Sequence, residues 1–230
     1  MKTINETTPV GQVARRFPAA IAVFEELDIE YACCGGRSVL DAAKAAGFGA
    51  KQLLDALRTA VAAGPADDES VSDLLHTIIT GHHRFESTEF RNLAARLEPL
   101  AGTNVVASRI RTILVELATT VSAHMLREER NLFPHIEELE LHPHRVRAGS
   151  ITRPLMTEFV EHDAVHDRLL KIRELSLRLR GTVDDDLVAD LEELYRAVHR
   201  HIHLENNVLI PRVVDLENQL RTSRRHGILT

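Results

Sequence analysis

A duplicated motif constrains the fold of this 230-residue chain more than any other feature. Glu128 follows His124 by four residues, Glu205 follows His201 by four, and in both copies a proline stands ten residues after the His. Residues four apart lie on one face of an α-helix, so each copy predicts a helix that presents an imidazole and a carboxylate in the same direction. The repeat therefore predicts a pseudo-twofold site between helices.

The segments around the motif have the periodicity of long amphipathic helices. Apolar residues recur at spacings of three and four from residue 72 onward. Gly and Pro together make up only 19 residues, from 11 Gly and 8 Pro, and Trp is absent. We predict an all-α fold, an up-down-up-down four-helix bundle. Its helices are expected at about 72–100, 105–138, 154–179 and 186–220.

A small helical domain is predicted before the bundle. Short helical segments are expected at about 10–16, 19–27, 39–46 and 51–62. Gly and Pro at 64 and 65 end this part, and a polar linker follows at 66–70. We therefore predict one domain at 1–65 and the bundle domain at 71–222.

Charge and hydropathy restrict the partners. The chain has 28 Lys and Arg against 34 Asp and Glu, a net charge of −6, which argues against nucleic acid and anionic membranes. No apolar run reaches the roughly 18 residues that span a bilayer, and the first residues lack the apolar core of a signal peptide. We predict a cytoplasmic protein that binds neither nucleic acid nor membrane.

Histidine is unusually abundant, with 13 residues, and several are spaced for metal binding. His83 precedes the first motif and His162 precedes the second by similar distances, and His166 follows His162 by four residues. If an oxygen atom and both carboxylates bridge two metal ions, each ion has three shared ligands. Five imidazoles then complete six-coordination on one ion and leave one open position on the other. Iron suits such ligands, with zinc, manganese or copper as alternatives. The predicted ligands are His83, His124, Glu128, His162, His166, His201 and Glu205.

Other residues leave alternatives open. A lone His on a helix is usually structural, and ferritin-like di-metal bundles use a different spacing, Glu-x-x-His. His82 replaces His83 if the helical phase is one residue off. His199 and His203 lie about 160° from His201 around the helix and are predicted to face solvent. The two prolines, Pro134 and Pro211, either kink their helices or end them.

The two cysteines, Cys33 and Cys34, are adjacent and are followed by two glycines. Neighbouring Cα atoms are about 3.8 Å apart, which is too close for an ordinary disulfide. Glycines permit unusual backbone angles and give little steric protection, so we expect these residues to form a loop. We predict that one of its thiols accepts or delivers iron, sulfur or a nitrosyl group. The alternative is a tight buried turn.

Together these motifs resemble a known family. Residues 10–43, with Tyr-Ala-Cys-Cys-Gly-Gly at 31–36, resemble the N-terminal domain of the RIC (repair of iron centres) proteins. The rest resembles their hemerythrin-like domain, notably at 122–129, 161–163 and 201–209. The resemblance implies two non-haem iron ions, oxo- and carboxylate-bridged, held by His83, His124, Glu128, His162, His201 and Glu205. It also implies repair of iron–sulfur proteins damaged by nitric oxide or oxidants.

One departure from the family pattern affects the expected function. The family has a further His about twenty residues after the first ligand, where this chain reads Ala-Gly-Thr-Asn at 101–104. Asn104 is expected to cap the second helix, and His166 would supply the missing nitrogen. The alternative function is a hemerythrin-like sensor or binding protein for oxygen or nitric oxide. A structural helical protein with incidental His is a third hypothesis; enzyme status and homodimer formation stay open.

Overall fold

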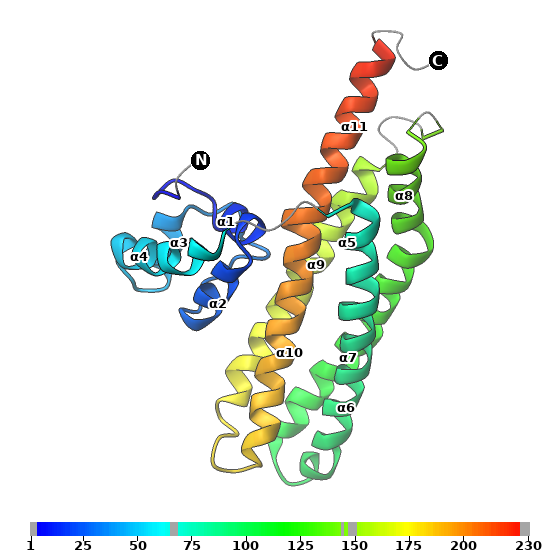
Figure 1. The fold of residues 1–230 in the computed structure, drawn as a ribbon. Helices are drawn as coiled ribbons and strands as arrows, with labels where there is room; N and C mark the ends of the chain where they lie inside the picture. Colours follow the sequence, from blue (N-terminus) through cyan, green and yellow to red (C-terminus); the bar gives the residue numbers. More distant parts are fainter. Residues whose placement is uncertain (1–3, 65–68, 144, 147–150, 226–230) are drawn as a thin grey trace. The chain divides into compact units, whose positions relative to one another are not determined.

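The computed structural model describes residues 4–64, 69–143, 145–146 and 151–225. Within these residues the regular elements are helices (Figure 1). One isolated β-bridge pairs Pro9 with Ser38. The all-α prediction is confirmed. Contacts divide the chain into two compact units, one of Met1–Glu69 with Ile202–Pro211 and one of Ser70–His201 with Arg212–Thr230. None of the described helices has the length and apolar character that a bilayer crossing requires.

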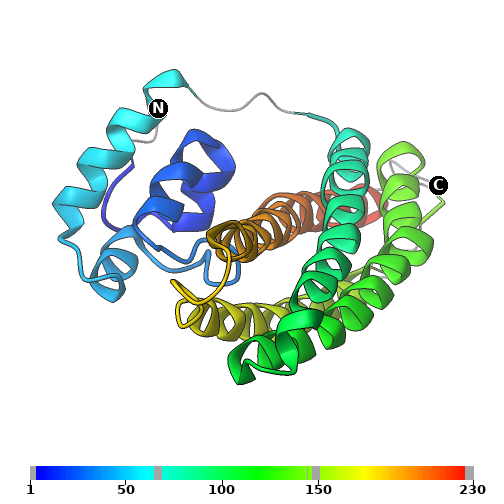
Figure 2. The same ribbon diagram turned by 90° about the horizontal axis from the view of Figure 1, so that it is seen from below.

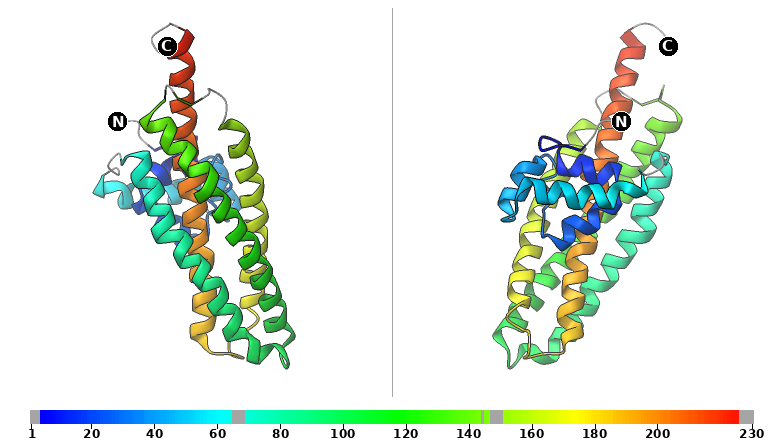
Figure 3. Two further views of the ribbon diagram at one scale, coloured as in Figure 1. Left: turned by 90° about the vertical axis from the view of Figure 1, so that its right-hand side faces the viewer. Right: turned by 60° about the vertical axis from the view of Figure 1, so that its left-hand side comes forward.

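Four helical rods form the bundle, and successive rods run in opposite directions (Figures 1 and 3). The predicted up-down-up-down bundle is therefore confirmed. Three rods contain a short π-helical turn, labelled η2, η3 or η4. In chain order the rods are α5 (Val71–Thr77), η2 (Ile78–His83) and α6 (Arg84–Ala101); α7 (Val105–Arg127), η3 (Glu128–Leu132) and α8 (Phe133–Leu141); α9 (Thr152–Ser176); and α10 (Asp185–His203), η4 (Leu204–Leu209) and α11 (Ile210–Arg225).

Apolar residues at helical spacing form the core of the bundle. Ile110, Leu114 and Leu117 on α7 and Leu93 and Leu97 on α6 are fully buried. Burial of each such side chain stabilises the fold by about 1.5–3 kcal/mol. The same stripe that predicted the helices thus holds them together.

Asn104 caps the second rod as predicted. Its side-chain oxygen Oδ1 accepts hydrogen bonds from the backbone N–H of Val106 at 2.9 Å and of Ala107 at 3.1 Å. These donors have no partner inside the helix, so the cap stabilises the start of α7.

The π-turns explain the two prolines. Pro134 is the second residue of α8 and Pro211 is the second residue of α11, and each follows directly on a π-turn. A π-turn widens the helix locally and lets it continue past an interruption of the regular hydrogen-bond ladder. Both rods continue beyond their proline, so the alternative that the prolines end the helices is wrong.

The first unit contains the short helices predicted for the N-terminal part, drawn in blue and cyan in Figure 2. They are α1 (Val10–Arg16), α2 (Ala19–Glu26), α3 (Val39–Ala45), α4 (Ala50–Ala60) and η1 (Val61–Ala63). Phe24, Tyr31, Val39, Leu53 and Leu57 form its buried core, with the Phe24 and Tyr31 rings stacked 5.7 Å apart. Most of the linker predicted at 66–70 lies outside the described residues.

Candidate metal centre

Two groups of buried side chains in the bundle bring ligand atoms together. In each group, one ligand atom from every member lies within 4.8 Å of the others. The groups share Glu128, so they define two adjacent cation positions. The first consists of His83, Glu128, His201 and Glu205, and the second of His124, Glu128, Glu158 and His162.

Glu128 lies between imidazoles of the first two rods. Its Oε2 atom is 3.6 Å from Nε2 of His83 and 3.3 Å from Nε2 of His124. The carboxylate is buried, and it begins the π-turn η3 directly after the helical turn that carries His124. Glu128 therefore has the position of a bridging ligand.

Each of three imidazoles has its Nδ1 atom beside a carboxylate. A carboxylate accepts the Nδ1 proton, which leaves the lone pair on Nε2. This arrangement orients metal-binding His side chains in proteins. The pairs are His83 with Glu129 at 2.7 Å, His124 with Glu161 at 2.7 Å, and His201 with Glu86 at 3.0 Å.

The donor set fits a pair of iron ions. The Nε2 atoms of His124 and His162 converge to 3.2 Å, a geometry suited to two nitrogens directed at one cation. Glu128 and Glu158 place buried carboxylates beside these nitrogens, and Glu205 places one in the first group. A buried carboxylate is costly unless its charge is compensated. Mixed imidazole and carboxylate ligands suit iron.

Comparison with known families agrees with this geometry. Residues 78–213 match the family model described as the hemerythrin HHE cation-binding domain. The chain belongs to this hemerythrin family. Residues 6–61 match a second model, described as a domain of unknown function, DUF542. The hemerythrin-like fold and the di-iron cofactor are thereby confirmed, and the two buried groups provide side chains that can hold the iron.

Named relatives contain both parts of the chain. The chain is 26% identical over 219 residues to "Iron-sulfur cluster repair protein YtfE" of Salmonella schwarzengrund (strain CVM19633), covering 90% of this chain and 96% of the relative. Proteins of the same name from Salmonella paratyphi B and Salmonella newport match with the same identity and coverage. These matches and the two domain models confirm the resemblance to the RIC proteins.

Six of the seven predicted ligands lie in the two hemerythrin groups, and His166 does not. His166 is one turn beyond His162 on α9, and its Nδ1 atom lies 2.9 Å from Nε2 of His199. Nδ1 of His199 lies in turn 3.1 Å from the carbonyl oxygen of Tyr195. The His166 imidazole thus pairs with α10 and belongs to neither group around Glu128.

Three further His predictions have different outcomes. His82 belongs to neither group; its ring stacks on that of His201 at 5.6 Å, so His83 is the residue that reaches the centre. The prediction that His199 and His203 face solvent is wrong, because both are buried. Their position on the helix directs both side chains away from the ligand groups, but neighbouring side chains bury them on that face. The His203 ring meets that of Tyr31 at 5.4 Å, and burial lowers the pKa of His203 to about 4.

The sequence reasoning missed the carboxylates around the imidazoles. Glu158 stands four residues before His162, the reverse order of the duplicated motif. Glu86, Glu129 and Glu161 each lie within three residues of a ligand in the sequence. A search for acidic residues one helical turn before or after each candidate His would have found Glu158 and Glu86.

The cysteine loop in the first unit is held by its backbone hydrogen bonds. The Glu30 carboxylate accepts from the N–H groups of Ala32 at 2.6 Å and Cys33 at 2.9 Å, and the Cys34 carbonyl accepts from Arg37 at 2.9 Å. Cys33 is half-buried, Cys34 is exposed, and neither forms a disulfide. The alternative of a tight buried turn is therefore wrong at Cys34.

Gly35 is required for space, which corrects the expectation of unusual backbone angles. Neither glycine of the loop has a positive φ. A Cβ atom on Gly35 would lie 2.2 Å from Oδ1 of Asn207, and one on Gly11 would lie 2.3 Å from the same oxygen. The Asn207 amide donates to the carbonyl oxygens of Tyr31 at 3.2 Å and Ala32 at 2.9 Å. The loop thus packs around this side chain of η4, within the first unit.

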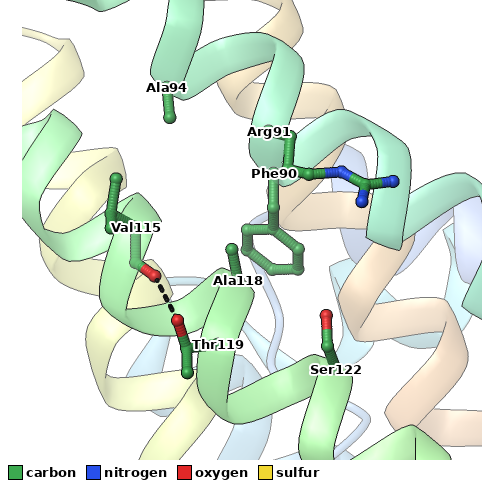
Figure 4. A pocket seen from close by; sticks show the side chains of 7 residues that line it. All are labelled: Phe90, Arg91, Ala94, Val115, Ala118, Thr119 and Ser122. Carbon is green, nitrogen blue, oxygen red and sulfur yellow. Dashed lines mark hydrogen bonds between the residues drawn. The ribbon is translucent and has the colours of Figure 1, made fainter.

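A pocket of about 480 Å³ between α6 and α7 is separate from these candidate residues (Figure 4). Its wall is largely apolar, and the Thr119 hydroxyl donates to the Val115 carbonyl oxygen on its own helix at 3.1 Å. The lining residues include none of the candidate ligands or cysteines; they are Phe90, Arg91, Ala94, Val115, Ala118, Thr119 and Ser122.

Proposed function

We propose that this hemerythrin-family chain repairs iron–sulfur clusters that nitric oxide or oxidants have damaged. Two adjacent buried groups of His and Glu side chains that share Glu128 carry the proposal. The relatives are named iron-sulfur cluster repair proteins, and this name supports cluster repair as the reaction and damaged iron–sulfur proteins as the clients. We place the protein and these clients in the cytoplasm, and divide the chain at 1–65 and 71–222.

The proposed ligands follow from the two groups. Glu128, which both groups share, would be a ligand of both iron ions, and the two imidazoles of each group would hold one ion. When bound, the iron supplies redox chemistry and exchangeable coordination for a small ligand such as nitric oxide or oxygen. The proposed ligands are His83, His201 and Glu205 for one ion, His124 and His162 for the other, and Glu128 for both.

The neighbouring carboxylates prepare the imidazoles for this task. Glu129 and Glu86 keep a proton on Nδ1 of His83 and His201, and Glu161 does so for His124, so the Nε2 lone pairs stay available. Burial of the ligands keeps competing water away from them.

The cysteine loop is proposed to exchange material with the client. A thiolate of Cys33 or Cys34 accepts iron and delivers it to the client by ligand exchange, without a change of oxidation state, because thiolates are good ligands for iron. The exposure of Cys34 supports this role, since a client must be able to reach the sulfur. The Glu30 side chain fixes the backbone that carries both thiols.

Recovery of a damaged cluster tests the proposal. The iron-loaded protein is mixed without oxygen with a [4Fe–4S] protein treated with nitric oxide, and the cluster absorbance of the client is followed. We expect the parent to restore it, and a Cys33→Ser/Cys34→Ser variant and a Glu128→Leu variant to restore it at least tenfold more slowly. His76→Ala, at an exposed position on α5, is the control.

One outcome would contradict the repair function, and a second would contradict the role of the thiols. No recovery by an iron-loaded parent that still binds nitric oxide would favour the sensor or binding protein. Full recovery by the double cysteine variant would remove the thiols from the mechanism and leave the iron centre alone responsible.

A further inference from the structure

Glu158 is a buried carboxylate of α9 that reaches the second group of ligands. It stands one helical turn before His162, and 8% of its surface is exposed. One of its oxygen atoms lies within 4.8 Å of ligand atoms of His124, Glu128 and His162. A side chain in this place either orients a ligand or is itself a ligand.

An orienting role does not account for Glu158. Its Oε2 atom lies 3.2 Å from Nδ1 of His124, but Oε2 of Glu161 lies closer, at 2.7 Å from the same nitrogen. An imidazole Nδ1 carries one proton, and the nearer carboxylate accepts it. Glu161 therefore orients His124, and Glu158 is a second carboxylate within reach of the same group of ligand atoms.

Charge points to a cation beside Glu158. Glu128 and Glu158 belong to one compact group and both are buried. Two carboxylates at such a distance repel each other and have lost their hydration, so they are stable together only with a proton or cation between them. The two imidazole nitrogens that converge beside them favour a metal ion over a proton.

The spacing on α9 supports the same assignment. Glu158 and His162 offer a carboxylate and an imidazole one helical turn apart on α9, as each copy of the duplicated motif does in its own rod, and both belong to the second group. We propose that Glu158 is a ligand of the second iron ion, in the place that the sequence assigned to His166. This inference rests on the proposed di-iron function.

Removal of the negative oxygen tests the inference. The parent and a Glu158→Gln variant are loaded with isotopically enriched iron and dialysed against a chelator, and iron content and Mössbauer spectra are measured. We expect iron to fall from about two ions per chain to about one, with loss of one of the two iron signals. A Glu158→His variant restores a neutral ligand and is expected to retain the second ion better than the Gln variant.

Two controls separate ligation from other effects. Glu217→Gln removes another buried carboxylate, on α11, which accepts from the Ile151 N–H at 3.2 Å, and should leave both iron signals unchanged. Glu161→Gln loosens the orientation of His124, so it should speed iron release while both signals persist. Circular dichroism checks that each variant is folded.

The inference is overturned if folded Glu158→Gln keeps two ions with unchanged Mössbauer parameters, because Glu158 would then have no bond to iron. It is overturned with the proposed function if the parent holds no iron. A parent that holds two ions, loses one in the Gln variant and repairs no cluster supports the inference and contradicts only the repair function.

Discussion

The two groups of the metal centre each contain two His and two Glu side chains, but helices of different geometry present them. In the first half, His83 ends the π-turn η2 and Glu205 lies in the π-turn η4. In the second half, Glu158 and His162 stand one turn apart on α9, a regular α-helix of 25 residues. Ligand side chains of the first group therefore come partly from π-turns, and those of α9 in the second group come from a regular α-helix.

The difference shows why Glu128 holds a central position. It is the first residue of η3, directly after the regular helix that carries His124, and it belongs to both groups. π-turns are uncommon and often mark functional sites because they redirect side chains without ending a helix. Changes to the shared carboxylate should therefore affect both halves, and changes elsewhere should affect one.

The largest effect is expected from the shared ligand. In a Glu128→Leu variant both ions lose a bond and iron should fall from about two ions per chain to well under one. Elemental analysis after gel filtration measures this, with Glu217→Gln as the buried-carboxylate control. Retention of one full iron ion would show that the halves are independent and that Glu128 does not bridge them.

Single imidazoles should separate the halves. His201→Ala and His124→Ala are each expected to reduce iron to about one ion per chain, because each removes a ligand from one half. His203→Ala should keep both ions but lower stability by about 2–4 kcal/mol, because a buried ring is lost. Iron analysis and thermal unfolding measure the two effects. Equal iron loss in all three variants would contradict the assigned helical phase.

The orienting carboxylates should have smaller effects. Glu129→Gln and Glu161→Gln are each expected to weaken iron binding about 10- to 100-fold, since an amide fixes the Nδ1 proton of its imidazole less well than a carboxylate. Competition with a coloured chelator measures the affinity of each half. No change in either variant would mean that packing alone orients His83 and His124.

The smallest effect tests the bundle away from the iron. Asn104→Ala should cost about 1 kcal/mol of stability through loss of the cap of α7, without any change in iron content. Chemical denaturation measures the free energy of unfolding. Iron loss in this variant would show that the start of α7 is coupled to the centre.

The amino-acid sequence predicts the bundle well, for physical reasons that particular residues illustrate. Buried leucines such as Leu93 and Leu114 repeat at helical spacing within the regular α-helices that the π-turns separate. Asn104 before a helical stripe is a local signal with a local cause, and the structure confirms it.

The site is predicted less completely, because helical phase gives direction and not surroundings. Phase turned His203 away from the iron, but only the tertiary fold shows that Tyr31 covers it. The helical spacing puts His166 one turn from His162, but only the packing of α9 against α10 brings its ring within hydrogen-bond distance of His199. Glu158 was missed because the duplicated motif puts His first, and α9 reverses that order.

Low-temperature Mössbauer spectroscopy in an applied magnetic field tests the central claim, two iron ions that share Glu128, most directly. The oxidised parent protein is loaded with enriched iron. We expect about two iron ions per chain, magnetically coupled through their shared bridges, with a diamagnetic ground state. Uncoupled paramagnetic iron, or one ion per chain, would contradict a shared carboxylate between the two halves.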